Sequence, residues 1–331
     1  MRYFFYFISI FLTTSILANH ADWMAQIPNT RVLNQLVIPG THDAGTDTII
    51  STSKFSLSND DPLPTWLEKI SNFLPVSLVR PIVAAWSKTQ PLSIEEQLDS
   101  GVRYFDFRVC DFQSHFYFCH ALLGTRLKTA LQQLREFSIK HPTEIILCDF
   151  NHVYNVKNDD DENQLITLLK NNLGDLAVPN TYQPSSTIGD IRASGRNVII
   201  FLSPTIHSTD SIYWSENNMD SSWPNVDNSV DLKKQLDIDM SAHAKNYQNN
   251  NQFFVLQAIK TESDAQVING VIDAKQYPNN IEQYESSVNM QLENWLSDYV
   301  ATYGPTSINI VMQDWFSTNN QLVDFAIQYD T

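Results

Sequence analysis

The stretch VIPGTHDAGTD, residues 37–47, guides the interpretation of the whole chain. A short apolar run leads into a Pro-Gly pair, and the polar pair His42-Asp43 follows at once. Apolar residues followed by turn residues and then polar side chains indicate a strand whose carboxyl end carries functional groups. The imidazole of His42 exchanges protons near neutral pH, whereas Asp43 contributes negative charge. The same letters also fit a histidine in a solvated turn, so the rest of the chain has to separate the two interpretations.

Seven apolar or β-branched runs recur along the chain, and most are nearly continuous rather than alternating. They are QLVIPG (35–40), RYFDFRV (103–109), FYFCH (116–120), EIILCDF (144–150), NVIIFLSP (197–204), FFVLQAI (253–259) and INIVMQDW (308–315). Continuous apolar runs are typical of strands buried on both faces of a parallel sheet. Amphipathic helical patterns at 127–140, 163–173 and 281–303 lie between them.

This alternation of strands and helices predicts an α/β protein with a parallel sheet. The chain has no glycine-rich dinucleotide fingerprint, no repeat and no long Pro/Gly/Ser linker. We therefore expect a single imperfect (β/α)8-like TIM barrel. The Asn- and Asp-rich segments 158–163 and 217–229 are expected to be solvated loops.

The charge balance of the 331 residues excludes one class of partner. Lys and Arg number 21 against 37 Asp and Glu, which gives a formal net charge of −16. A duplex nucleic acid requires a basic face, so no nucleic-acid partner is expected. Long-range attraction to an anionic membrane is disfavoured for the same reason.

The first 18 residues have the pattern of a signal peptide. Arg2 precedes a short apolar run, and small or polar residues end at Ala18, after which cleavage is expected. The predicted organisation is therefore a signal peptide at 1–18, a barrel at 19–331 and a secreted monomer. The absence of an Asn-x-Ser/Thr sequon favours a bacterial source. Export permits disulfides, and the spacing leaves Cys110 and Cys119 either bonded to each other or as two buried thiols.

One insertion lies between the first two strand candidates. Residues 53–91 are rich in Leu, Val, Phe and Trp and are interrupted by prolines. The segment fits a helical lid packed on the barrel. It also fits an amphipathic rim that enters lipid, with Trp66, Leu78, Val79 and Trp86 as its apolar side chains.

Polar groups follow several of the predicted strands. His42 and Asp43 follow the first, Arg108 ends the second, His120 ends the third and Asp314 ends the last. In a parallel barrel these ends meet on one face, where catalytic groups lie. Two histidines, two acids and one arginine supply a base, an acid and an anion-binding cation. That set suits cleavage of a phosphodiester by a neighbouring hydroxyl.

At these positions the sequence resembles the bacterial-type phosphatidylinositol-specific phospholipase C family, the X-domain phosphodiesterases. The resemblance is an ordered series of segments between about Val37 and Phe316. It is carried by IPGTHDAGT (38–46), QLDSGVRYFDFRV (97–109), FYFCHALLG (116–124) and VMQDW (311–315), with support from HPTEIIL (141–147) and IGDIRASGRNVII (188–200).

The resemblance implies a role for each matched residue. His42 would be the general base on the inositol 2-hydroxyl, oriented by Asp314. His120 would be the general acid toward the diacylglycerol oxygen, assisted by Asp43. Arg108 would stabilise the charge on the phosphoryl oxygens, and the products would be diacylglycerol and a cyclic inositol phosphate.

The same segments argue against a metal or other cofactor. Calcium-dependent relatives resemble His-Asn in the first segment and Glu-x-Asp in the second, whereas this chain has His42-Asp43 and Asp106-Phe107-Arg108. Calcium needs several oxygen ligands, and Arg108 stands where one carboxylate would be. We therefore expect a metal-independent site.

Two departures from the family concern the headgroup and the residue after His120. Ala121 stands where many relatives carry glycine, and the family's inositol-contacting Lys and Arg have no clear match. Asn151 and His152 are the candidate substrate contacts, and Trp86 is the candidate on the membrane-contacting rim. The leading prediction is a phospholipase C that acts on phospholipid at a membrane surface. The alternatives are a phosphodiesterase on another lipid or glycerol phosphodiester, and a catalytically silent lipid-binding module.

Overall fold

The computed structural model describes residues 20–56, 65–72, 74–317 and 320–331, and the expected signal peptide at 1–18 lies outside these residues. The strands are β1 (Ile38–Thr41), β2 (Tyr104–Asp111), β3 (Phe116–His120), β4 (Leu122–Arg126), β5 (Ile146–Tyr154), β6 (Val198–Leu202), β7 (Tyr213–Ser215), β8 (Met219–Asp220), β9 (Phe253–Gln257) and β10 (Ile310–Gln313). The α-helices are α1 (Thr65–Ser71), α2 (Val76–Ser87), α3 (Ile94–Asp99), α4 (Leu127–Lys140), α5 (Asp159–Leu173), α6 (Ile188–Ala193), α7 (Ser229–His243), α8 (Asp264–Ile272), α9 (Ile281–Asn289), α10 (Leu292–Tyr303) and α11 (Gln321–Asp330).

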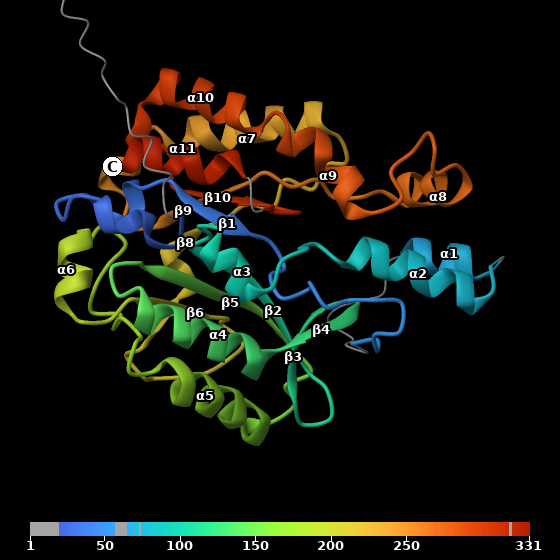
Figure 1. Cartoon of the computed structure of the whole chain (residues 1–331), viewed down its shortest axis with the longest axis horizontal. Coiled ribbons are helices and arrows are strands. Elements are labelled where there is room, and N and C mark those ends of the chain that lie inside the picture. The colour runs from blue at the N-terminus through green and yellow to red at the C-terminus, as the bar shows by residue number, and fades with distance from the viewer. Residues whose placement is uncertain (1–19, 57–64, 73, 318–319) are drawn as a thin grey trace, which may run out of the picture.

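Eight strands form a nearly closed parallel barrel. Their order is β7-β6-β5-β2-β1-β10-β9-β8, and every neighbouring pair in it is parallel. Helices lie around this sheet, with α4 and α5 on one side of it and α7, α10 and α11 on the opposite side (Figure 1). Strands β1, β6, β9 and β10 are buried along their whole length, as continuous apolar runs require. The predicted TIM-barrel fold is confirmed.

The run FYFCH is a strand, but it lies outside the barrel. Strand β3 pairs antiparallel with β2, in register Val109 with Phe118, and β4 then pairs antiparallel with β3. Only residues 112–115 join β2 to β3, and a parallel return needs a crossover of a dozen or more residues. The connection is therefore a hairpin, and the expectation that His120 ends a barrel strand is wrong. A disulfide joins Cys110 of β2 to Cys119 of β3.

Two expectations about helices are also corrected. The pattern at 281–303 forms two helices, α9 and α10, rather than one. The segment 158–163 is not a loop, because helix α5 begins at Asp159. The Asn158 side chain caps this helix by accepting the backbone N–H groups of Asp160 and Asp161, and the acidic first turn complements the helix dipole.

The insertion forms α1 and α2, which project from the barrel beside α8 (Figure 1). Lys69 of α1 contacts Asp264 of α8 at 2.6 Å, and the three helices share a small apolar core. Trp86 lies in that core with 2% of its surface exposed, and its ring centroid is 5.5 Å from that of Tyr284. The expectation that Trp86 lies on an exposed rim is therefore wrong. Within the described residues, no helix is long and apolar enough to cross a membrane.

Candidate active site

Three neighbouring strands bring most of the predicted residues to one mouth of the barrel. His42 and Asp43 follow β1, Arg108 lies in β2, and Asp314 follows β10. Strand β1 pairs with both β2 and β10, so these side chains meet although they are far apart in the sequence. His120 reaches the same place from the end of β3.

Sharp backbone turns accompany these strand ends. Asp43, Ala121 and Trp315 have φ angles of 44°, 55° and 55°, in the left-handed region that most side chains avoid. Each lies next to a candidate catalytic residue, so the chain turns away from the strand just after presenting it. The conformation of Ala121 also gives a physical reason why glycine suits this position.

His42 is held on several sides and only 5% of its surface is exposed. Its Nδ1 lies 2.9 Å from Asp314 Oδ1, and its Nε2 lies 3.2 Å from Arg108 Nη2. Because a guanidinium only donates, Nε2 is the acceptor in this contact and Nδ1–H donates to Asp314. The imidazole therefore presents an unprotonated nitrogen to the mouth of the barrel.

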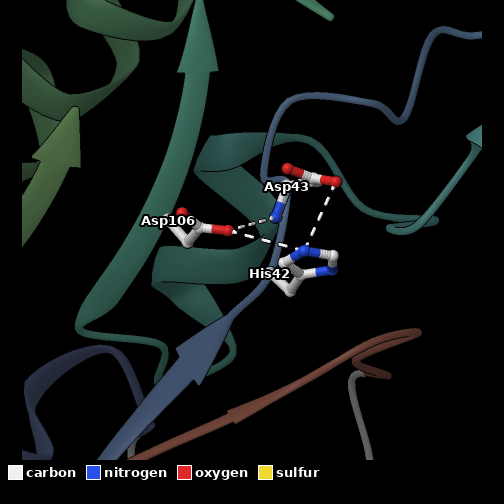
Figure 2. A group of neighbouring side chains, drawn as sticks. All are labelled: His42, Asp43 and Asp106. Carbon is white, nitrogen blue, oxygen red and sulfur yellow. Dashed lines mark hydrogen bonds and ion pairs between the residues drawn. The ribbon is translucent and has the colours of Figure 1, made fainter. Parts of the chain in front are cut away.

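Asp43 lies between both histidines and the arginine. Its Oδ1 lies 2.7 Å from Arg108 Nε, and its Oδ2 lies 3.4 Å from His42 Nε2 and 3.9 Å from His120 Nε2. The backbone N–H of Asp43 donates to Asp106 Oδ2 at 3.1 Å. Figure 2 shows His42, Asp43 and Asp106 converging at the end of β1.

His120 is more open, with 23% of its side chain exposed. Its Nδ1 lies 3.1 Å from the carbonyl oxygen of Ser87, so Nδ1–H is the donor and Nε2 faces Asp43. Ser87 is the last residue of α2, where the helix dipole favours a positively charged neighbour. The insertion thus contributes directly to the site by orienting His120.

Burial disfavours the charged forms of His42, Asp43 and Asp314. It lowers the pKa of His42 and raises the pKa of Asp43 to about 7, against the opposing effects of Arg108 and His42. Burial also raises the pKa of Asp314 to about 8. The His42–Asp314 pair therefore retains one proton near neutral pH, between Nδ1 and Oδ1, and leaves Nε2 able to accept another.

One group of side chains could hold a metal ion. His42, Asp43 and Asp106 each offer a ligand atom, and these atoms lie within 4.8 Å of one another. The guanidinium of Arg108 already contacts both His42 and Asp43. A divalent cation at this point would face that fixed positive charge, so the donor set favours Arg108 itself as the cation.

A cavity of about 530 Å³ opens beside His42 and Arg108. Asn151 and His152, the candidate substrate contacts, both line it. Asn151 donates a hydrogen bond to Asp106, and His152 lies 2.7 Å from Asn151. The expectation that they lie near the catalytic residues agrees with this position, whereas Trp86 does not line the cavity.

Sequence reasoning missed several residues of the site. The other lining residues are Tyr104, Asp106, Asp149, Pro204, Glu216, Ser221, Trp223, Gln257 and Met312. Asp149 lies in the predicted strand EIILCDF (144–150), and an acidic residue within this apolar run could have marked it as a site residue. Trp223 lies in the segment 217–229, which we expected to be solvated, yet its ring centroid is 5.2 Å from that of His42.

Gln90 was missed because nothing in its sequence neighbourhood marks it. Its side chain is fully buried, and Nε2 donates to the carbonyl oxygens of His42 and Gln313 at 3.0 Å each. Its Oε1 accepts the backbone N–H of Phe316. Gln90 therefore fastens the two strand ends that carry His42 and Asp314.

Two known proteins align with most of this chain. The mouse PI-PLC X domain-containing protein 2 is 28% identical over 317 residues, covering 93% of this chain and 86% of that protein. The human PI-PLC X domain-containing protein 2 is 29% identical over 268 residues, covering 78% and 83%. This chain is a relative of the PI-PLC X domain proteins. No family model matches it.

Solved structures of two bacterial enzymes share this fold. The phosphatidylinositol-specific phospholipase C from Listeria monocytogenes superposes with a TM-score of 0.65 at 18% identity, covering 95% of this chain and 99% of that one. The enzyme from Staphylococcus aureus, as an F249X mutant, gives 0.62 at 16% identity, covering 95% and 98%. The resemblance predicted from the sequence segments is confirmed. The fold is that of the bacterial phosphatidylinositol-specific phospholipases C.

Proposed function

We propose that this chain is a secreted, metal-independent phospholipase C that cleaves phosphatidylinositol-type lipids into diacylglycerol and a cyclic inositol phosphate. One observation carries the proposal: Asp43 Oδ2 lies between the Nε2 atoms of His42 and His120, at 3.4 and 3.9 Å. A base and an acid on either side of one carboxylate suit a displacement at phosphorus. The names of the relatives and the bacterial fold support the same class of reaction.

In the proposed step His42 Nε2 takes the proton of the inositol 2-hydroxyl. The freed oxygen attacks phosphorus and forms the new O–P bond, while the O–P bond to diacylglycerol breaks. His120 Nε2–H gives its proton to the departing oxygen. The step consumes no water, and both phosphorus–oxygen bonds to the inositol remain in the cyclic product.

Arg108 stabilises the negative charge that grows on the phosphoryl oxygens. Its guanidinium lies 3.2 Å from the base and 2.7 Å from Asp43, so it is already placed where the phosphate must lie. A fixed donor in a buried site needs no reorganisation during the reaction. Asp43 holds the Arg108 fork and balances the charge of the two histidines. No cofactor takes part in this scheme.

Phosphorus NMR of the products tests this proposal. Purified protein is given phosphatidylinositol, phosphatidylcholine and glycerophosphoinositol, each with and without excess EDTA. We expect a cyclic inositol phosphate from the first substrate at the same rate in EDTA. Cleavage of another diester but not of phosphatidylinositol would replace this function. Loss of activity in EDTA that calcium restores would refute the metal-independent mechanism. Lipid binding without cleavage would indicate a catalytically silent lipid-binding module.

We propose further that the protein is exported and acts as a monomer at a lipid surface. The Cys110–Cys119 disulfide supports export, because disulfides persist in oxidising compartments. Exposed apolar side chains support lipid contact: Leu78 of α2 is 54% exposed and Ile272 of α8 is 74% exposed. These helices follow β1 and β9, so they stand beside the mouth that holds the site. Burial of apolar surface can bind lipid despite the net charge of −16.

Two residues of α2 separate lipid contact from packing. Leu78→Ser should weaken binding to phosphatidylinositol vesicles and spare activity on a short-chain soluble substrate. Trp86→Ala should instead lower thermal stability and affect both substrates alike, because Trp86 is buried. Unchanged vesicle binding by Leu78→Ser combined with Ile272→Ser would contradict the proposed lipid surface.

A further inference from the structure

A second cavity, of about 460 Å³, lies outside the barrel, between α9, α10 and the start of α11, and is called the outer cavity below. Met312 of β10 lines the cavity beside His42, whereas the next residue, Gln313, lines the outer cavity. Successive residues of a strand point to opposite faces, so the two cavities lie on opposite faces of β10. Helices α9, α10 and α11 lie over this outer side of the barrel (Figure 1).

Gln313 is a polar residue in a position where packing alone would favour an apolar one. It is 1% exposed, and Val311, two residues earlier on the same face of β10, is fully buried. The Nε2 atom of Gln313 is buried and has no acceptor within the described chain. A buried amide without a partner costs free energy, so this position points to a ligand that supplies the acceptor.

Asn289 of α9 presents the complementary group to the outer cavity. Its Nδ2 donates to the carbonyl oxygen of Asp314 at 3.0 Å, and this contact determines which atom of the amide is the oxygen. The Oδ1 of Asn289 is buried and receives no donor from the residues that the structure describes. The outer cavity therefore combines one buried donor, from Gln313, with one buried acceptor, from Asn289.

The charged residues of the outer cavity have one sign. Glu282 and Glu293 line it, and its described lining contains no Lys, Arg or His. A phosphate or carboxylate would be repelled there, whereas an ammonium group would be attracted. The buried side chains of Leu292, Leu296 and Leu322 supply an apolar part of the same lining. These groups fit a ligand that has a positive charge and an aliphatic body.

The chemistry of the lining narrows the ligand further. Gln313 requires an acceptor and Asn289 requires a donor, and a hydroxyl group beside an ammonium group provides both. A simple sugar brings hydroxyl groups without the positive charge. An amino acid brings the charge but adds a carboxylate, which Glu282 and Glu293 would repel.

We propose that the outer cavity binds a small amino alcohol with an aliphatic side chain. The ligand's hydroxyl oxygen accepts from Gln313 Nε2, its ammonium group donates to Asn289 Oδ1, and its aliphatic part packs on the leucines. This site is independent of the proposed function, because none of its residues takes part in the proposed reaction. Gln313 and Trp315, on either side of Asp314, both line it, so a bound ligand contacts the strand end that carries the partner of His42.

Calorimetry on the purified full chain tests the site without relying on turnover. The probes are leucinol, isoamylamine, isohexanol and leucine, which respectively present the amino alcohol, lack its hydroxymethyl group, lack its ammonium group and add a carboxylate. We expect leucinol to bind at least about tenfold more tightly than each of the others. Equal binding of leucinol and isoamylamine would overturn the role of the amide pair, and equal or tighter binding of leucine would overturn the charge selection. No binding of leucinol would refute the site.

Gln313→Met removes the unpartnered donor and nearly conserves the side-chain volume. Gln132→Met, at an exposed position of α4, is the matched control. Gln313→Met should weaken leucinol binding by about tenfold. Its Tm without ligand should rise by about 2 °C, because no buried donor is left unpaired. A lowered Tm would show that the amide already has a partner such as a bound water, and either that result or unchanged leucinol binding would refute the site.

Glu293→Gln tests the charge of the outer cavity at an exposed position of α10, and Glu136→Gln on α4 is its control. Glu293→Gln should weaken the binding of leucinol by roughly a few-fold and leave the weaker binding of isohexanol unchanged. An equal loss for both probes, or no loss for leucinol, would contradict the proposed ammonium contact.

Discussion

The two histidines of the site are held in different ways. His42 is enclosed by the barrel, and its contacts with Asp314 and Arg108 come from strands that pair with its own. His120 lies on the hairpin outside the barrel, is 23% exposed at its side chain, and is oriented by the last carbonyl of α2. One histidine belongs to the closed sheet, and the other belongs to structures added to it.

This difference matches what the two proposed roles require. A base must be deprotonated and aimed at a small hydroxyl group, which a buried, pre-positioned imidazole provides. An acid must meet the oxygen of a bulky lipid leaving group, which requires access from the open side. The contrast predicts that damage to His42 is severe with every substrate, whereas damage to His120 depends on the leaving group.

The largest effect is expected for His42→Ala. Removing a general base costs up to about 10⁴-fold in kcat, and a better leaving group does not replace it. Turnover of phosphatidylinositol and of an inositol phosphate ester with a nitrophenol leaving group should both be lost. His207→Ala, at an exposed histidine, is the matched control. Near-normal activity of His42→Ala on either substrate would disprove its role as the base.

A smaller and selective effect is expected for His120→Ala. Diacylglycerol is a poor leaving group and should suffer about a 10²- to 10³-fold loss in kcat. Nitrophenolate needs little protonation, so the nitrophenyl substrate should lose less than about tenfold. The ratio of the two rates measures the acid's contribution. Equal losses on both substrates would show that His120 positions the site rather than donating a proton.

The acid limb of the pH profile of kcat/KM reports the buried environment of His42. Burial lowers the pKa of His42 below its ordinary value of 6.5, so the base form persists in more acidic solution. Activity should therefore fall as pH decreases through a value below 6.5, where His42 becomes protonated. The test is a series of rates on the nitrophenyl substrate from about pH 4.5 to about pH 8, a range that spans the titration of a histidine. A midpoint at or above the ordinary value would contradict it.

The smallest effect is expected from reducing the Cys110–Cys119 disulfide. The bond joins the strand that carries Arg108 to the residue just before His120, so its loss should loosen His120 more than His42. Treatment with dithiothreitol should lower kcat on phosphatidylinositol by roughly a few-fold, because a small displacement of His120 slows proton transfer to the leaving group. Activity on the nitrophenyl substrate should be spared. The Cys110→Ser, Cys119→Ser double variant should reproduce this, and Cys148→Ser should not. Equal loss on both substrates would indicate general destabilisation.

The barrel and the His42 side of the site could be predicted because both follow from local patterns. Continuous apolar runs are found as β1, β2, β5, β6, β9 and β10. Polar residues just beyond β1 and β10 meet because parallel strands end on the same side. The position of a residue just after a strand in the sequence therefore predicts its position at the mouth of the barrel.

The His120 side could not be predicted in the same way, because it depends on contacts between elements. The run FYFCH does not reveal its antiparallel pairing, and the carbonyl of Ser87 has no sequence signature. Trp86 was misplaced because an amphipathic helix beside a second helix can bury what would otherwise be exposed. Glu216, Ser221 and Trp223 of the cavity lining were missed because they follow the short strands β7 and β8, which no apolar run marks in the sequence.

The pairing of β1 with β10 also determines when the site is completed. The hydrogen bond between His42 and Asp314 spans 272 positions of the chain. Contacts this distant form late in folding, because the intervening segments must first be ordered. A growing chain therefore carries the His42 imidazole without its Asp314 carboxylate until strand β10 docks. A copy cut short before Ile310 would lack both β10 and Asp314, so it would lose the strand between β1 and β9 and could never complete the pair.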